Sequence, residues 1–408
     1  MMRYRLSTYT VTITGYNSDG EGVSRLPDGR VVFVRGAARD DVSEITLVKE
    51  QNRVTWAEIV RIINPSPYRV DSDCALFPEC GGCDYRHITY EEELSAKLQC
   101  VNDALERIGG LSVKVGEILN TGQINGYRNK AVLHSDGDSV GFYRAKSHEV
   151  IPIEHCLLLR DDLNDEIKSL VKKGISSRLG ETILRSGANR TVSMTPNVEN
   201  STFPDRRTVP HQIQEELDGI VFTLEGFFQV NTNAALLLFQ KAREFAALSK
   251  NDTLIDLYCG VGALTLFVGR DAGRAVGIEL NPDAVTIARE NAMRNGFSHI
   301  EFIHADAAAW TTDITESDCV IVDPPRKGLT QSTINKIFEL APKRLVYISC
   351  NPSTMARDLK ILTGGVGFPT GAGLSHCYSI NDICAVDMFP RTANIECCCL
   401  LERNLKDG

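Results

Sequence analysis

The stretch Leu254–Leu266, LIDLYCGVGALTL, decides the fold of the C-terminal half of this chain. It reads as a short apolar strand, a tight turn at Gly260 and Gly262, and the start of a helix. Further apolar runs, each followed by a helical pattern, are RAVGIELN, IEFIHADA, CVIVDPPR and RLVYISCN. Because continuous apolar strands that alternate with helices are typical of a doubly wound, mostly parallel sheet, we expect such a domain over residues 226–408.

Three acids end three consecutive strands of the expected sheet, at Asp256, Glu279 and Asp306. Ligands bind beyond the carboxyl ends of such strands, where Glu279 could accept hydrogen bonds from ribose hydroxyls and Asp306 from an adenine amino group. Position 265 is Thr, so the full G-x-G-x-x-G of diphosphate binders is missing. A nucleoside without a diphosphate fits better, and S-adenosylmethionine is the leading candidate. A turn glycine with no ligand is the alternative for the G-x-G alone.

A cysteine, two carboxylates and an arginine follow the later strands. Cys350 lies just past RLVYIS, and the segment Asp323-Pro-Pro-Arg326 ends the preceding strand. A thiolate that adds to carbon 6 of uracil turns carbon 5 into a nucleophile towards a sulfonium methyl, after which a base must remove the carbon 5 proton. Glu396, in MFPRTANIECCCLL, could be that base. The plainer alternatives are a buried apolar cysteine and a solvated glutamate.

The composition limits the class of protein. A chain of 408 residues suggests two or three domains, and 43% apolar with 24% charged residues is ordinary for a soluble globular protein. Neither a secretory signal nor a run of about 18 apolar residues is present, so we expect a cytoplasmic protein without a membrane span. The net charge of −9 means that any RNA partner must meet a local basic surface.

The N-terminal half divides at Asn64–Tyr68, NPSPY, which reads as a linker. Before it, short alternating runs over residues 1–60 predict a small antiparallel OB-like β-barrel. After it we expect a central α+β domain over residues 61–225, whose helix at about 90–110 could pack on the catalytic domain. Three cysteines, Cys74, Cys80 and Cys83, stand within the stretch DCALFPECGGCDYRH. In a reducing compartment such density indicates ligands, and a four-cysteine zinc site is one interpretation.

Several motifs together resemble the RNA uracil-C5 methyltransferases: DPPRKGL, SCNPSTMARDL, GFFQVN, DLYCGVG and a closing MFP-x-T-x-x-x-E. Enzymes of this family make 5-methyluridine in ribosomal and transfer RNA from S-adenosylmethionine, with a Rossmann-like methyltransferase domain. The resemblance implies that Cys350 is the nucleophile, Glu396 the base and Asp323 the group that holds the uracil. The cofactor-binding positions that it implies are Gln229, Asp256, Tyr258, Gly260, Gly262, Glu279, Asp306 and Asp323.

The same resemblance assigns residues to the RNA and marks two departures. Phe227 resembles part of the lining where target base and cofactor meet, and Arg326 is expected on the substrate side. The family commonly has His two residues before the base, whereas this chain has Asn394 there, and Arg391 replaces another frequent His. The target uridine must be flipped out of any stack to reach Cys350, which favours a loop or bulge.

The ribosomal branch of the family carries a 4Fe–4S cluster on four cysteines, three of them spaced C-x5-C-G-G-C. By resemblance the ligands are Cys74, Cys80, Cys83 and, in IPIEHCLLL, Cys156. The role that we expect for the cluster is structural. The N-terminal barrel resembles the TRAM domain, a small RNA-binding module. Candidate phosphate contacts are Arg25, Arg30, Arg35, Arg39 and Arg53 in the barrel, and Arg128, Lys130, Arg144 and Lys146 in the central domain.

We therefore expect an S-adenosylmethionine-dependent methyltransferase that acts on carbon 5 of a uridine in 23S ribosomal RNA. Transfer RNA is the nearest alternative substrate, and a cytosine-C5 methyltransferase would use a similar thiol. From another class, the chain could be a non-catalytic RNA-binding or ribosome-assembly factor. No obligate protein partner is indicated.

Overall fold

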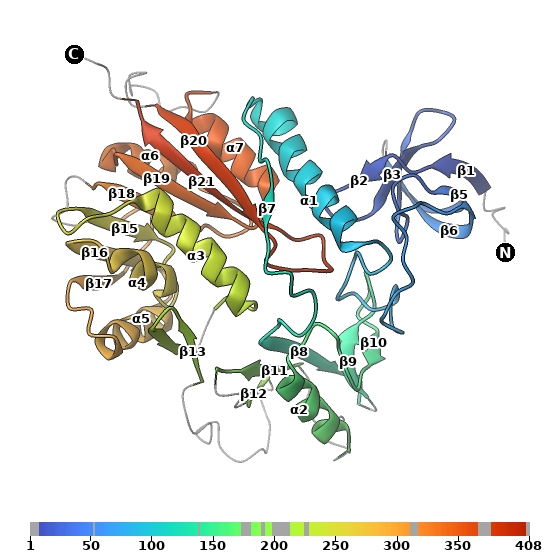
Figure 1. The fold of residues 1–408 in the computed structure, drawn as a ribbon, viewed down its shortest axis with the longest axis horizontal. Coiled ribbons are helices and arrows are strands. Elements are labelled where there is room, and N and C mark those ends of the chain that lie inside the picture. The colour runs from blue at the N-terminus through green and yellow to red at the C-terminus, as the bar shows by residue number, and fades with distance from the viewer. Residues whose placement is uncertain are drawn as a thin grey trace.

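The protein is described by a computed structural model that comprises an N-terminal β-sheet, a central region and a C-terminal α/β region (Figure 1). In Figure 1 the N-terminal sheet lies at the right, the α/β region at the left and the central sheet below them. The residues that the structure describes are 8–51, 54–137, 139–172, 181–188, 192–197, 213–223, 228–310, 317–365 and 377–404.

The N-terminal sheet has the strand order β1-β5-β6-β4-β3-β2. Its strands are β1 (Thr8–Thr12), β2 (Gly15–Tyr16), β3 (Gly22–Arg25), β4 (Val31–Val34), β5 (Val42–Gln51) and β6 (Val54–Asn64). The sheet curls closed, because Thr14 N donates to Val23 O at 2.8 Å just past the end of β1. One expectation was wrong: β4 and β6 are parallel, since the β5–β6 hairpin lays β6 between β5 and β4. Alternation predicts which face a residue occupies but not which strands are neighbours.

The central region contains a second antiparallel sheet, with the order β10-β9-β8-β11-β12. Its strands are β8 (Lys130–Ser135), β9 (Val140–Tyr143), β10 (Val150–Pro152), β11 (Glu181–Ser186) and β12 (Val192–Asn197), with α2 (Asp161–Lys172) packed against it. A separate hairpin joins β13 (Gln214–Leu217) to β14 (Ile220–Thr223). The cysteine loop, residues 74–86, precedes the helix α1 (Tyr90–Ala104).

Helix α1 belongs to the core of the α/β region rather than to the central sheet. Thr89 caps it by accepting Glu92 N, and it runs into a π-helical turn, η1 (Leu105–Gly109), that ends at Gly110 with φ of +65°. Val101 and Leu105 are fully buried in the same apolar cluster as Met355 of α7 (Pro352–Leu362). Figure 1 shows α1 beside β7 (Ile118–Leu119), the edge strand of the large sheet.

The large sheet has the order β17-β16-β15-β18-β19-β21-β20-β7. Its remaining strands are β15 (Thr253–Leu257), β16 (Arg274–Glu279), β17 (Ile300–His304), β18 (Cys319–Val322), β19 (Arg344–Ser349), β20 (Tyr378–Val386) and β21 (Glu396–Arg403). The helices between them are α3 (Thr232–Ala246), α4 (Ala263–Gly269), α5 (Pro282–Arg294), α6 (Gln331–Leu340) and α7. The five strands from β17 to β19 are parallel, as predicted, while β21 is antiparallel to both of its neighbours.

The topology creates a switch point. The chain runs outward from β15 to β17 and then returns to the other side of β15 as β18, so the carboxyl ends of β15 and β18 face a crevice. An apolar core cluster covers each face of the sheet, and Cys397, Cys398 and Cys399 of β21 are buried in these two clusters.

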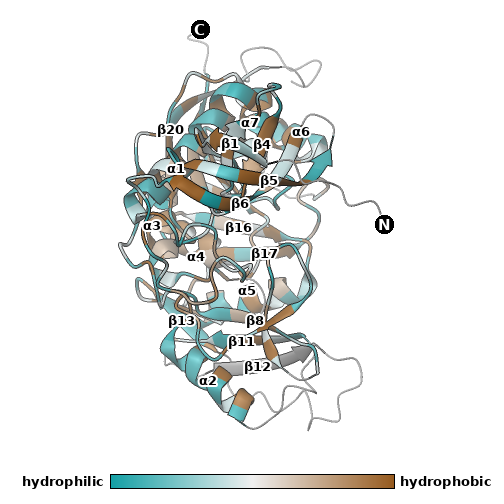
Figure 2. Cartoon of the chain, turned by 90° about the vertical axis from the view of Figure 1, so that its right-hand side faces the viewer, coloured by the Kyte–Doolittle hydropathy of each residue, from teal (hydrophilic) through white to brown (hydrophobic). Residues whose placement is uncertain are grey.

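The surface is mostly polar. Figure 2 shows apolar colour on β5 and β6, where Val48, Val60 and Ile63 are exposed. In the part of the chain that the structure describes, no helix has both the length and the apolar character needed to cross a membrane.

Candidate active site and cysteine cavity

The turn after β15 has the backbone that the glycine pattern predicts. Tyr258, Gly260 and Gly262 all have positive φ, at +70°, +55° and +80°. A Cβ atom on Gly262 would lie 2.6 Å from Phe302 Cζ, so only glycine fits there. The N–H groups of Tyr258 and Cys259 donate to Ile278 O at 3.0 and 3.1 Å, which fixes the turn against β16.

The three acids at the strand ends lie around this turn and differ in burial and in hydrogen bonding. Glu279 accepts Gly260 N at 3.0 Å and Asn281 N at 2.8 Å, and Asp306 is exposed and accepts Ala308 N at 2.8 Å. Asp256 is buried; it accepts the Thr265 hydroxyl at 2.6 Å on Oδ2, while its Oδ1 has no partner in the described part of the chain. Burial raises the pKa of Asp256 to about 7.

These features suit a nucleoside cofactor. A backbone turn without side chains at 260 and 262 lets a ligand approach closely, and carboxylate oxygens suit ribose and amino-group donors. The Tyr258 hydroxyl is 3.0 Å from Thr333 Oγ1, so its ring is held at the rim of the turn. The residues present therefore fit the group that the sequence predicts.

The described part of the FFQVN segment precedes α3. Gln229 is buried and its backbone oxygen accepts Asn129 Nδ2 at 3.1 Å. Asn231 caps α3 by accepting Ala234 N at 3.1 Å, and its Nδ2 donates to Met388 O at 3.2 Å. Phe227, predicted at the meeting point of base and cofactor, lies outside the described residues.

Strand pairing brings Cys350 and Glu396 together. Strands β19 and β21 are antiparallel and pair Ser349 with Cys397, so the residue after Ser349 and the residue before Cys397 come next to each other. These are Cys350 and Glu396. Asp323 follows β18, the strand on the other side of β19. The sheet therefore gathers at one edge the three residues that the sequence predicts to react.

The charges at this end of the sheet shift the pKa values of the side chains. Burial and then the Glu396 carboxylate raise the pKa of the Cys350 thiol, while the Arg326 guanidinium opposes them. Burial and then Asp323 raise the pKa of Glu396 well above its ordinary value. Burial raises the pKa of Asp323 itself to about 7. Without ligands the site therefore favours protonated, neutral groups at neutral pH.

Among the described residues, Arg326 is the cation whose charge acts on both Cys350 and Glu396, and two asparagines hold its segment. Its Nη2 donates to Asn394 Oδ1 at 3.1 Å, and its backbone oxygen accepts Asn351 Nδ2 at 3.1 Å. Asn351 also caps α7, with Pro352 in the first helical turn. Asn351 was not among the predicted site residues, although Asn-Pro after a strand is a helix-start signal that could have identified it.

The four cysteines predicted as ligands line a single cavity of about 900 Å³. All are free thiols, and Arg86 Nε lies 3.3 Å from Cys83 Sγ. Burial raises the pKa of Cys83 to about 12, against the opposing charges of Arg86 and Arg128. Within the described ranges, no group of three or more His, Cys, Asp or Glu side chains could hold a metal ion. The structure thus gathers the four thiols but does not show a metal site.

The same cavity extends from the N-terminal sheet to the active-site edge. It is lined by Arg35 of that sheet, by Lys130 and Arg128 of the central region and, at its far end, by Asn394. Carboxylates already bind several of the predicted phosphate contacts. The ion pairs are Arg144 with Glu79 and Glu149, Lys146 with Glu21, Arg39 with Glu92, and Arg30 with Asp28 and Glu50. Arg25 donates to Gly29 O at 3.1 Å, and Arg53 lies outside the described residues.

Two family models match the chain. Residues 68–404 match tRNA (uracil-5-)-methyltransferase, and residues 2–60 match the TRAM domain. A Bacillus cereus (strain ATCC 10987) protein named "Uncharacterized RNA methyltransferase" is 32% identical, with 94% of each chain covered. A Synechocystis protein, also named as an uncharacterized RNA methyltransferase, is 32% identical. That match covers 97% of this chain and 96% of the Synechocystis protein.

One solved structure matches nearly the whole chain. It is the tRNA (uracil-54, C5)-methyltransferase of Pyrococcus abyssi in complex with S-adenosyl-L-homocysteine. The match has a TM-score of 0.74 and 25% sequence identity, and it covers 96% of this chain and 99% of the other.

Proposed function

This chain belongs to the tRNA (uracil-5-)-methyltransferase family, and from that premise we propose that it methylates a uridine of RNA through a covalent bond to Cys350. It is an S-adenosylmethionine-dependent RNA uracil-C5 methyltransferase with an N-terminal TRAM domain. The observation that carries the proposed mechanism is the pairing of Ser349 with Cys397, which sets Cys350 beside Glu396.

In the proposed reaction the Cys350 thiolate adds to carbon 6 of the uracil, and the electron pair of the ring double bond moves towards carbon 5 and the oxygen on carbon 4. When bound, S-adenosylmethionine would supply an electrophilic methyl group, so that carbon 5 forms a bond to the methyl carbon while the methyl–sulfur bond breaks and a neutral thioether is released. Glu396 then takes the carbon 5 proton, the double bond re-forms, and the Cys350 sulfur leaves. Asp323 holds the polar edge of the uracil, and Arg326 stabilises the thiolate before it attacks.

The cofactor is proposed to lie in the crevice at the carboxyl ends of β15 and β18, next to the ends of β16 and β17. Because Gly260 and Gly262 have no side chains, the cofactor could approach the backbone of the turn closely. Glu279 and Asp306 would accept hydrogen bonds from its ribose and its adenine. The remaining cofactor contacts that we propose are Gln229, Asp256, Tyr258 and Asp323. The buried Asp256 Oδ1, which has no hydrogen-bond partner among the described residues, supports a polar ligand or water at this point.

We propose 23S ribosomal RNA as the substrate, held along the cavity that runs from Arg35 to Asn394. The resemblance of the cysteine spacing to the ribosomal branch favours it. Transfer RNA is the second candidate, because the matched Pyrococcus abyssi enzyme acts on tRNA. A substrate in the cavity would have to displace or share the carboxylate partners of Arg144 and Lys146. An RNA substrate and free thiols both suit the proposed cytoplasmic location. We also propose that the domains divide at residues 60 and 225.

A 4Fe–4S cluster on Cys74, Cys80, Cys83 and Cys156 is part of the proposal. Support comes from the four thiols that line one cavity and from the two arginines beside them, which suit an anionic cluster. A 4Fe–4S cubane is also larger than one zinc ion, so its four cysteine ligands can lie farther apart. The four sulfur ligands of a zinc ion must all lie about 2.3 Å from the metal. Protein purified without oxygen should be brown and contain iron, whereas colourless protein with stoichiometric zinc would overturn the cluster.

Methylation of defined RNA tests the activity. We expect purified protein and S-adenosylmethionine to produce 5-methyluridine in unmodified 23S ribosomal RNA, measured by nuclease digestion and mass spectrometry. Product in tRNA but not in 23S RNA would correct the substrate. A product methylated on cytosine, or none in either RNA, would contradict the proposed activity.

A further inference from the structure

The connection between β20 and β21, residues 387–395, leads directly into Glu396. It is longer than the two to five residues usual in a hairpin, so local turn geometry alone would not fix its path. It nevertheless makes hydrogen bonds to β7, α1, the cysteine loop and the start of α3. The position of the proposed base therefore depends on segments far away in the sequence.

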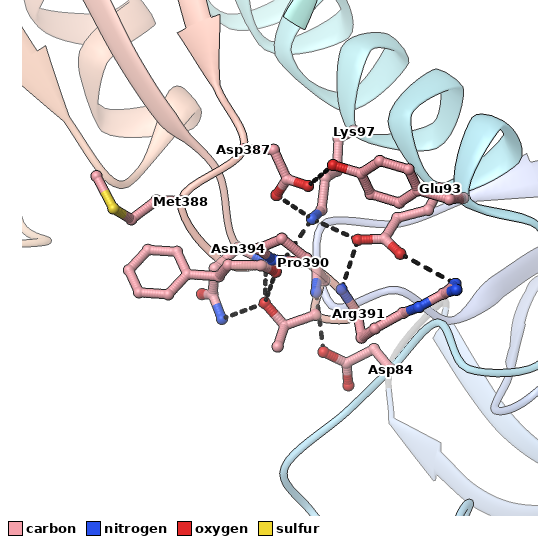
Figure 3. A network of polar contacts seen from close by, with 12 residues as sticks. Asp84, Glu93, Lys97, Asp387, Met388, Pro390, Arg391 and Asn394 are labelled. Atoms are coloured by element: carbon pink, nitrogen blue, oxygen red, sulfur yellow. Dashed lines mark hydrogen bonds and ion pairs between the residues drawn. The ribbon is translucent and has the colours of Figure 1, made fainter. Parts of the chain in front are cut away.

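A buried ion cluster on α1 holds the beginning of this connection (Figure 3). Lys97 Nζ donates to Glu93 Oε1 and to Asp387 Oδ1, both at 2.7 Å, and to Phe389 O at 3.2 Å. The side chains of Lys97, Glu93 and Asp387 are completely shielded from solvent. The ammonium group thus satisfies its three donors with three acceptors, and the Tyr90 hydroxyl binds the other oxygen of Asp387 at 2.7 Å.

The cysteine loop holds the middle of the connection. Arg391 O accepts Asp84 N at 2.9 Å, and Asp84 Oδ2 accepts Ala393 N at 2.9 Å. On its other side, Arg391 N donates to Glu93 Oε1 at 2.7 Å. Arg391 has φ of +70°, a left-handed backbone that residues with side chains seldom adopt, and these hydrogen bonds maintain it. Asp84 directly follows Cys83, so the cysteine cavity and the active-site connection are physically joined.

The far end of the connection reaches the reacting groups. Asn394 accepts a hydrogen bond from Arg326, and the charge of Arg326 lowers the pKa of Cys350. Glu396, two residues after Asn394, begins β21. Buried ion pairs add little net stability compared with apolar packing, but each member constrains where the others lie. This cluster joins α1 to the start of the connection that precedes Glu396.

We propose that Lys97, together with Glu93 and Asp387, is a positioning residue that sets Glu396 against carbon 5 of the bound uracil. The cluster fixes the 387–395 connection at its start, and Asp84 fixes it beside the cysteine cavity. The inference rests on the proposed role of Glu396 as the base. Removal of the cluster should therefore slow proton removal more than it slows formation of the Cys350 bond.

The test is Lys97→Met, which keeps an unbranched side chain but removes the charge. We expect kcat to fall by about 10²-fold, as for a misplacement of about 1 Å, with KM for RNA within about twofold. The intermediate linked through Cys350 should accumulate with ordinary uridine RNA, as a slower band in denaturing gels. Lys114→Met makes the same change at an exposed site and should leave both measurements unchanged.

A milder variant keeps the test decisive if Lys97→Met does not fold. Tyr90→Phe removes only one hydrogen bond to Asp387, and we expect kcat to fall between about twofold and tenfold with the same accumulation. Normal turnover without accumulation in the folded variants, or an effect on KM alone, would overturn the positioning role. A wild-type protein that makes no 5-methyluridine would instead overturn the proposed function, so the two failures differ.

Discussion

Two regions of this molecule contain the cysteines to which we assign a function, and opposite charges surround them. Around Cys350 are two carboxylates, Glu396 and Asp323, that raise the pKa of the thiol, whereas the guanidinium of Arg326 lowers it. Around the cysteine cavity, Arg86 and Arg128 stand next to Cys83 and lower the pKa that burial raises. In the proposed mechanism the first arrangement would keep the Cys350 thiol protonated until a cationic cofactor and RNA bind, and the second would suit a permanently bound anionic group.

The largest effect that we expect comes from Cys350→Ala. If only this thiol forms the covalent bond, kcat should fall by roughly 10⁴-fold or more. Methyl incorporation into RNA under single-turnover conditions measures it. Cys384→Ala, the same change at a half-buried thiol of β20, is the control and should stay within about twofold. Equal losses in the two variants would mean that Cys350 has no special role.

The next effect concerns the base. Glu396→Gln keeps the shape of the side chain but cannot accept the carbon 5 proton, so kcat should fall by about 10²- to 10⁴-fold. Protein linked to RNA should accumulate, because the bond to Cys350 forms but is released slowly. Loss of activity with no linked species would indicate that Glu396 acts before the bond forms, contrary to the comparison drawn above.

The charges around Cys350 also predict a pH dependence. The thiol and Glu396 both have raised pKa values, and that of Asp323 is about 7. Since the reaction needs the thiolate and the carboxylate, activity is lost as pH falls through these values and gained as pH rises. We expect kcat/KM to increase with pH across the neutral range, by about tenfold per pH unit for each required group that is still protonated. A flat profile from about pH 6 to 9, or one that falls, would show that the acidic groups do not control the thiol.

The smallest effect on rate should come from the cysteine cavity. Cys83→Ser should remove the visible absorbance and most of the iron, and lower the melting temperature by roughly 5 °C. Methylation by protein that remains folded should decrease by less than about tenfold, because the substitution reaches the reacting groups only through the loop at Asp84. A loss as large as that of Cys350→Ala would mean that the cavity takes part in the chemistry, and the two sulfur regions would no longer be distinct.

Some residues of this site could be predicted from the sequence and others could not, because different physical rules determine where they lie. The strand-end residues Asp256, Glu279 and Asp323 were predictable because the carboxyl ends of parallel strands meet at one edge. The placement of Cys350 beside Glu396 needed the antiparallel register of β19 and β21, which no local pattern encodes. Cys156 came from a resemblance alone, and the structure brings it to the same cavity as the other three cysteines.

The buried cluster was missed for a definite reason. Glu93 and Lys97 stand four residues apart in a helix, a spacing that usually indicates an exposed ion pair of small energy. Only the packing of α1 against the 387–395 connection buries them and supplies Asp387 as a second carboxylate. The parallel pairing of β4 with β6 was missed likewise, because it depends on strand order.

The most direct measurement is a trap with RNA that contains 5-fluorouridine, in which fluorine replaces the proton that Glu396 would remove. After methyl transfer the ring cannot eliminate fluorine as a cation, so the RNA should remain attached. We predict a stable complex that forms only with S-adenosylmethionine and whose modified peptide contains Cys350. Attachment at another cysteine, or full turnover of the methyl donor on normal RNA with no attachment to the fluorinated RNA, would contradict the covalent mechanism.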